Sequence, residues 1–90
     1  MPYVSTHDRE RFAPTLEEAE REMEERGVTP GVLNYLVSKL AAAYVRRKGR
    51  DYTHLNDVVG ALDSAKAEFV RRVVAPYEDE KIAANGDIYS

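Results

Sequence analysis

The chain has 90 residues, a formal charge of −3, no cysteine and no tryptophan. A single domain of this length buries only about 60–65% of the surface that its unfolded form exposes, so we expect it to need a partner chain. The lack of cysteine excludes a disulfide framework, a thiolate zinc site and a cysteine nucleophile. The sequence shows no signal peptide and no apolar run of the roughly 20 residues that a bilayer requires, which predicts a soluble, cytoplasmic protein.

Charge divides the chain into three parts. Residues 1–29 carry eight acids and four bases, residues 30–75 carry four acids and eight bases, and residues 76–90 carry four acids and one base. A basic middle between acidic arms can be neutralised by its own arms, by the arms of a neighbouring subunit or by an anionic ligand. Ordinary solvated charged faces are the simplest alternative.

The N-terminal third predicts an arm followed by a short helix. Residues 1–14 are polar, contain two prolines and show no sustained period, so we expect an arm that is ordered only when something holds it. Thr15, followed three residues later by Glu18, is typical of a capping box. This pattern predicts a short acidic helix over 15–27 that ends at Gly27 and carries only a narrow apolar stripe.

A second helix should begin at Thr29-Pro30, because threonine can cap a helix and proline suits its first turn. We expect it to run to Lys48 and to end at Gly49, with its last cations opposing the negative end of the helix dipole. One face of this helix is apolar within about 140° of arc. The face consists of Leu33, Leu36, Val37, Leu40, Ala41 and Tyr44.

Thr53 fits as the cap of a third helix that runs to Ala75. Its apolar stripe consists of Leu55, Val58, Val59, Leu62, Ala65, Phe69 and Val73. The link between the two long helices is short, so they should be antiparallel neighbours. The predicted fold is therefore all-α: an antiparallel αα-hairpin over 29–75, with the short acidic helix before it, within a single domain over 1–90.

Pro76 should break or kink the third helix, because proline lacks the backbone N–H that an interior position needs. A C-terminal tail over 76–90 follows, in which one or two further turns would end at Asn85-Gly86. We expect the hairpin to form a homo-oligomer, because apolar and small side chains lie outside its seam, where another copy could approach closely. The alternative is that the short N-terminal helix covers this face within the same chain.

Lys66 has the least usual position, since a helical wheel places it at the centre of the apolar stripe. A lysine there snorkels, pairs with a carboxylate or receives an anionic ligand.

Two basic poles are expected at the ends of the hairpin. Arginine beside tyrosine suits a phosphate and a stacked base, although cations are common at helix C-termini for other reasons. Arg71, Arg72 and Tyr77 should lie beside Asn34 and Tyr35 at one pole. Arg46 and Arg47 gather at the other. With Lys66, these are the candidate ligand-binding residues.

No catalytic residue, metal site or cofactor is predicted. His54 and Asp57 are one helical turn apart, but two ligands do not make a metal site. No Ser/His/Asp arrangement is recognisable, and the five glycines match no nucleotide-binding fingerprint. The net negative charge argues against duplex DNA as a partner. The sequence therefore predicts a binding protein rather than an enzyme.

Several segments resemble a family of short uncharacterised proteins found in tailed phages and prophage-bearing bacteria. The resemblance is carried by residues 33–36 (LNYL), 55–60 (LNDVVG), 65–82 (AKAEFVRRVVAPYEDEKI) and 85–89 (NGDIY), with the opening MPYV. It implies a phage or mobile-element context and supplies no function. The rod ending RRVVAP also looks, more loosely, like the phage helical-hairpin sponges that sequester cyclic nucleotide signals, of the anti-CBASS and anti-Thoeris kind.

Two functions follow as hypotheses. The first is a non-enzymatic oligomer whose basic, tyrosine-lined pockets between subunits hold an anionic small ligand such as a cyclic nucleotide, sequestering an immune signal. The second is a structural or interaction module that binds a host or phage protein without a small ligand.

Overall fold

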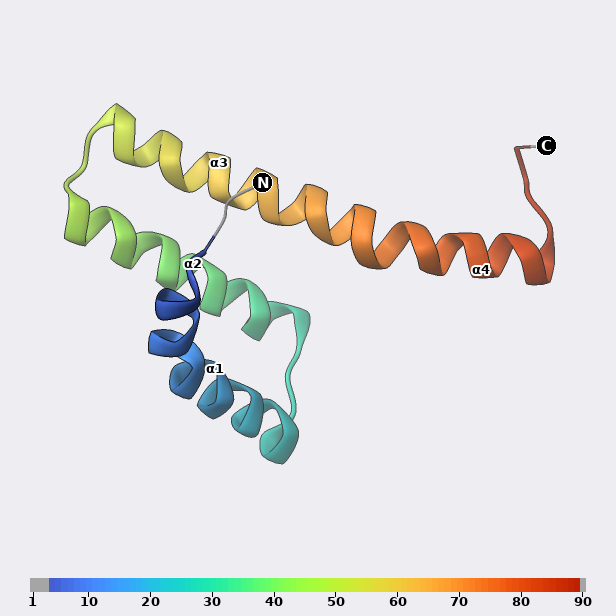
Figure 1. Ribbon diagram of the computed structural model, residues 1–90, viewed down its shortest axis with the longest axis horizontal. Helices are drawn as coiled ribbons and strands as arrows, with labels where there is room; N and C mark the ends of the chain where they lie inside the picture. Colours follow the sequence, from blue (N-terminus) through green and yellow to red (C-terminus); the bar gives the residue numbers. More distant parts are fainter. Residues whose placement is uncertain (1–3, 90) are drawn as a thin grey trace.

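The computed structural model describes residues 4–89, of which about 86% are helical and none forms a strand (Figure 1). The all-α prediction is confirmed at this level. The elements are α1 (Thr6–Arg26), α2 (Pro30–Lys48), α3 (Tyr52–Phe69), the π-helical turn η1 (Val70–Val74) and α4 (Ala75–Asn85). The opening residues of the predicted arm and of the MPYV motif, 1–3, lie outside the described part.

The predicted arm and the helix start at Thr15 are wrong, because α1 already begins at Thr6. The Ser5 hydroxyl accepts a hydrogen bond from the Asp8 N–H at 3.1 Å, which makes Ser5 the N-cap. Pro14 lies inside the helix without ending it. The predicted end at Gly27 is confirmed, with a φ of 81° that glycine adopts without strain.

The bounds predicted for α2 are confirmed at both ends. Thr29 caps the helix by accepting from the Val32 N–H at 3.2 Å, and Pro30 occupies the first turn. The helix ends at Lys48, and Gly49 follows with a φ of 107°.

The N-cap of α3 is Asp51 rather than the predicted Thr53. The Asp51 carboxylate accepts from the His54 N–H at 2.9 Å. Aspartate is a stronger N-cap residue than threonine, so the helix begins after Asp51 rather than after Thr53.

Of the break or kink predicted at Pro76, a break does not occur, because η1 and α4 continue α3 without interruption to Asn85. A wider, π-helical turn just before Pro76 accommodates the proline, which has no backbone N–H. In this turn the Ala75 N–H donates to the Val70 carbonyl, five residues back. The further turns expected after the proline are confirmed and end at Gly86, with a φ of 90°. We call the continuous helix formed by residues 52–85 the rod; at 1.5 Å per residue it is about 51 Å long.

The elements contact one another sparsely. α2 and α3 run in opposite directions from their connecting turn, and α3 is the one other element that α2 approaches within 8 Å between Cα atoms (Figure 1). No residue between 4 and 89 is buried. The radius of gyration is 17.0 Å, whereas a compact chain of this length would have about 12 Å. Of the helices described, none is long and apolar enough to cross a membrane.

Candidate functional site

The C-terminal end of α2 carries a cluster of cations that we call the basic end. It consists of Arg46, Arg47 and Lys48 in the last turn of α2, and Arg50 in the following link. All four are exposed, and none forms an ion pair with any residue between 4 and 89. These cations oppose the negative end of the α2 dipole and leave their hydrogen-bond donors to solvent. The basic end can therefore bind an anionic group without first breaking an ion pair.

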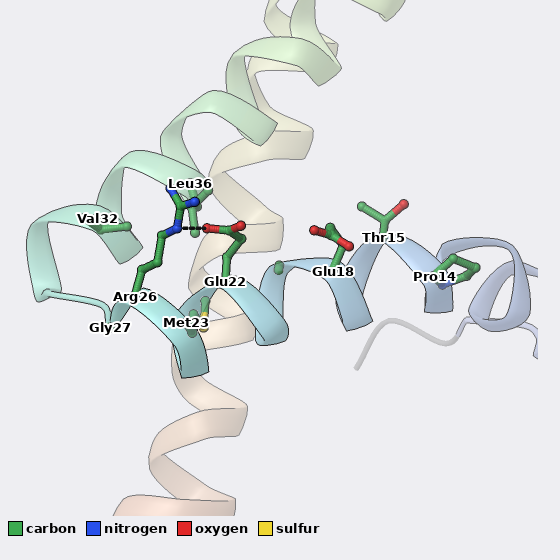
Figure 2. A pocket seen from close by; sticks show the side chains of 10 residues that line it. Pro14, Thr15, Glu18, Glu22, Met23, Arg26, Gly27, Val32 and Leu36 are labelled. Atoms are coloured by element: carbon green, nitrogen blue, oxygen red, sulfur yellow. Dashed lines mark ion pairs between the residues drawn. The ribbon is translucent and has the colours of Figure 1, made fainter.

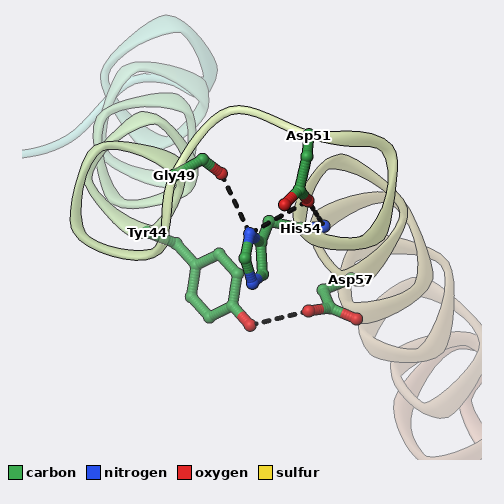
Figure 3. Close-up of polar contacts among 5 residues, drawn as sticks. All are labelled: Tyr44, Gly49, Asp51, His54 and Asp57. Carbon is green, nitrogen blue, oxygen red and sulfur yellow. Dashed lines mark hydrogen bonds and ion pairs between the residues drawn. The ribbon is translucent and has the colours of Figure 1, made fainter.

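A polar network joins α2 to α3 beside the basic end (Figure 3). The Tyr44 hydroxyl donates to the Asp57 carboxylate at 2.9 Å. His54 Nδ1 lies 3.0 Å from the Gly49 carbonyl and 3.0 Å from an Asp51 carboxylate oxygen. Both neighbours of Nδ1 are acceptors, so this nitrogen carries the proton. These bonds fix the geometry of the turn.

The same network changes the pKa of Tyr44 and gives His54 and Asp57 separate hydrogen-bond partners. The hydrogen bond to Asp57 raises the pKa of the Tyr44 phenol, with smaller contributions from partial burial and from the negative charge of Asp57. His54 and Asp57, one turn apart in the sequence, are each held by a different partner and do not converge on a common point. Their arrangement supports a structural role at the turn.

The residues predicted for the pole opposite the basic end are dispersed. Arg71, Arg72 and Tyr77 lie along the rod, whereas Asn34 and Tyr35 lie on α2, and no Cα atom of residues 70–85 comes within 8 Å of α2. Within one chain the structure does not bring the two sets together.

Four of the residues predicted for this pole, Asn34, Tyr35, Arg71 and Tyr77, contact neighbours on their own helix. The Asn34 carboxamide accepts from the Ser38 hydroxyl at 3.1 Å, and the Lys39 ammonium is 5.9 Å from the Tyr35 ring centroid. On the rod, Arg71 is 3.5 Å from the Glu68 carboxylate, and the Lys81 ammonium is 5.3 Å from the Tyr77 ring centroid. These contacts are between side chains of one helix and define no shared site.

Lys66 lies on α3, where the sequence predicts that it snorkels, pairs with a carboxylate or receives an anionic ligand. The side chain is exposed and forms no ion pair with the described part of the chain. Because the side chain is exposed, the ammonium stays in water and needs no carboxylate partner.

Two hollows lie beside α2, and neither contains a predicted ligand-binding residue. The larger, about 640 Å³, lies between α1 and the start of α2 (Figure 2). Apolar Met23, Val32 and Leu36 share it with Glu18 and with Glu22, which pairs with Arg26 at 3.6 Å. Its carboxylates would repel an anion.

The second hollow, about 390 Å³, lies between α2 and α3 and is almost wholly apolar. Its lining residues are Val37, Leu40, Ala41, Tyr44, Asp57, Val58, Ala61 and Leu62. Leu40 is 73% exposed although it belongs to the predicted core face. The groove suits an apolar side chain from another helix better than it suits a charged ligand.

Comparison with known proteins places the chain in a family but gives it no function. No curated protein and no solved structure matches the chain. A family model described as a domain of unknown function, DUF6899, matches residues 1–88. The chain therefore belongs to the DUF6899 family.

Proposed function

We propose that this chain is a non-enzymatic interaction protein that completes its apolar core by associating with further copies of itself. The observation that carries the proposal is the absence of any buried residue between 4 and 89. A fold held only by local helix contacts gains little of the apolar burial that normally offsets the entropy of ordering a chain. Association supplies that burial.

The exposed area supports this proposal quantitatively. The chain exposes 8219 Å², whereas a compact protein of its mass would expose about 5,300 Å². The surplus of about 2,900 Å² per chain, or about 5,800 Å² for two chains, is at the upper end of obligate homodimer interfaces, which bury about 2,000–5,000 Å² or more in total. A surplus of this size and apolar character fits a permanent assembly.

The test is the mass of the native particle by light scattering across a hundredfold range of concentration. We expect a multiple of 10.2 kDa that persists on dilution to micromolar chain. A particle of single-chain mass throughout would contradict self-association. If a pull-down from lysate then recovered one defined protein in a fixed ratio to the chain, the alternative function, an interaction module for a different protein, would replace self-association.

A second candidate function is the binding of an anionic small ligand, such as a cyclic nucleotide. It is favoured by the basic end, whose four cations lack carboxylate partners in the described chain. Phosphate oxygens suit arginine donors in geometry and charge. In a phage or prophage setting such binding would sequester a nucleotide immune signal in the host cytoplasm, as the likeness to helical sponges suggests.

Calorimetric titration with cyclic di- and trinucleotides tests the second candidate. We expect binding that the double variant Arg46→Ala, Arg47→Ala weakens at least tenfold. The matched control is Arg21→Ala, Arg26→Ala, which removes two cations that already pair with Glu18 and Glu22. Flat titrations across the set of nucleotides would refute a nucleotide ligand.

A further inference from the structure

One side of α2 carries leucines that lie between the side facing α1 and the side facing α3. Leu33, Leu36 and Leu40 follow at intervals of three and four residues, which places them in one line along the helix. Leu36 lines the hollow beside α1 and Leu40 lines the groove beside α3, so the line runs between these two neighbours. Leu33 is 52% exposed and Leu40 is 73% exposed. Large apolar side chains exposed in one line indicate a surface that another helix covers.

A cation continues this line of leucines at the C-terminal end of α2. Arg47 follows Leu40 by seven residues, which is close to two full turns, so it lies on the same side of the helix. Its neighbours Arg46 and Lys48 lie about 100° further round in either direction. Arg47 is exposed and forms no ion pair with any residue between 4 and 89. A helix that covers the leucines therefore also meets this guanidinium.

Carboxylates lie at the other end of the line, beside the start of α2. Glu18 and Glu22 of α1 line the same hollow as Leu36 (Figure 2). Glu18 pairs with Arg21, and Glu22 pairs with Arg26, which also lines the hollow. Both pairs are exposed and lie within one helix, where such pairs are weak, and each carboxylate has lone pairs left for a further donor. Residues 17–26 carry six acids and two bases, so this end of the line attracts another cation.

A second copy of this chain fits both ends of the line at once. If two copies of α2 lie antiparallel and cross at Leu40, positions equally far from Leu40 meet, so Arg47 of each copy comes beside Leu33 of the other. That position is at the start of the other copy's α2, where the acid-lined hollow lies. The surface is then complementary to itself, as a twofold contact requires, because both partners use the same patch. An unrelated basic helix would match the acidic end alone.

We propose that two copies of this chain pair antiparallel along α2, about a twofold axis close to Leu40, with Arg47 of each copy bound to Glu18 and Glu22 of the other. The two Leu40 side chains then pack against each other. Leu36 packs beside the partner's Ala43, whose small side chain lets the helices approach closely. This proposal rests on the proposed self-association and names the surface that it uses. It also gives Arg47 a protein partner in place of an anionic ligand.

Charge reversal tests the pairing. Arg47→Glu sets carboxylates against carboxylates, and Glu18→Lys, Glu22→Lys sets cations against a cation. We expect each variant alone to dissociate at a chain concentration at least tenfold higher than the unmodified chain, by light scattering and native mass spectrometry. An equimolar mixture should form the mixed dimer, because opposite charges then meet at both ends of the contact. The chain that carries all three substitutions should form a homodimer again for the same reason.

Two controls make the same changes of charge outside the contact. Glu17→Lys, Glu24→Lys replaces two exposed acids of α1 that lie on the side turned away from the hollow. Arg72→Glu replaces an exposed arginine of the rod. Both controls should associate within twofold of the unmodified chain. The proposal is overturned if neither the mixture nor the triple variant associates, or if the controls weaken association as much as the reversals do.

Cross-linking tests the direction of the pairing, with no background because the chain has no cysteine. Disulfides need Cα atoms about 4.4–6.8 Å apart. We expect oxidised mixtures of Leu36→Cys and Ala43→Cys to give the mixed disulfide dimer in excess over either variant alone. A parallel contact would instead link each variant to itself and would overturn the proposal. If the chain oligomerises and no reversal or cross-link has an effect, this contact is wrong while self-association stands; a monomeric chain would refute both.

Discussion

At the scale of single residues, the hydrogen bond between Tyr44 and Asp57 makes stability depend on pH in the alkaline range. The bond, 2.9 Å long, raises the pKa of the Tyr44 phenol above its ordinary value. A pKa raised in the folded state contributes stability that is present below about pH 10, the unfolded value, and is lost as the pH rises through the folded value. We expect the unmodified chain to lose more stability above pH 10 than Tyr44→Phe, in urea unfolding at pH 8 to 11.

The variant Asp57→Asn is the matched control for this prediction, because it keeps the shape of the side chain and removes its charge. Difference spectra of the phenolate, taken against Tyr44→Phe, should show Tyr44 titrating closer to its ordinary value when Asp57 is replaced. Identical titrations with and without the carboxylate would show that the bond does not form in solution.

Asp51 provides a second prediction at this scale, since it caps α3 in place of Thr53. Asp51→Ala should lower the free energy of unfolding by about 1 kcal/mol, the usual value of an N-cap. Thr53→Ala, the control, should change the free energy by less than about 0.5 kcal/mol, as surface substitutions do. Thermal unfolding followed by circular dichroism measures both. A larger loss of unfolding free energy for Thr53→Ala than for Asp51→Ala would show that Thr53 is the N-cap of α3.

At the scale of helices, the sequence predicts an element well where a strong signal has no competitor. The bounds of α2 follow from Thr29, Pro30 and Gly49, each of which has one obvious role. The sequence predicts the start of α1 too late, because residues 1–14 are polar, contain two prolines and show no sustained period. Ser5, with Asp8 three residues later, has the spacing of a cap and could have located the start.

The candidate site was predictable only as far as it lies within one helix. The cations at the end of α2 are consecutive in the sequence, so the basic end could be found without a structure. The Tyr44 bond to Asp57 was missed because it depends on the register between two helices, which the turn at Gly49 fixes. The expected approach of Arg71 to Asn34 fails for the same reason, since spacing along the chain does not say how far two helices diverge.

Pro14 gives the prediction that belongs to α1. A proline in a helix interior costs about 3 kcal/mol relative to alanine, because a hydrogen bond is lost and the ring meets the preceding turn. We expect Pro14→Ala to raise helix content and to slow amide exchange over 14–18. Pro30→Ala is the control, since proline at the first position of α2 displaces no bond. Unchanged exchange after Pro14→Ala would mean that residues 6–13 are not helical in solution.

At the scale of the whole molecule, the apolar helix faces that the sequence predicts do not close into an internal core. The apolar face of α2 divides: Leu36 lines the hollow beside α1, while Val37 and Tyr44 line the groove beside α3. No face closes completely, and Leu40 remains 73% exposed. Periodicity identifies which side of a helix is apolar, and it cannot tell whether the covering helix belongs to the same chain.

Self-association predicts that stability depends on chain concentration. If the folded state is a dimer and the unfolded state a single chain, a tenfold increase in concentration stabilises the dimer by about 1.4 kcal/mol through mass action. For a particle of this size, that corresponds to a rise of about 3–6 °C in the thermal midpoint. Scanning calorimetry at chain concentrations a hundredfold apart measures it. A midpoint that does not move across this range would mean that each chain unfolds alone, and the exposed faces described above would then have no copy to cover them.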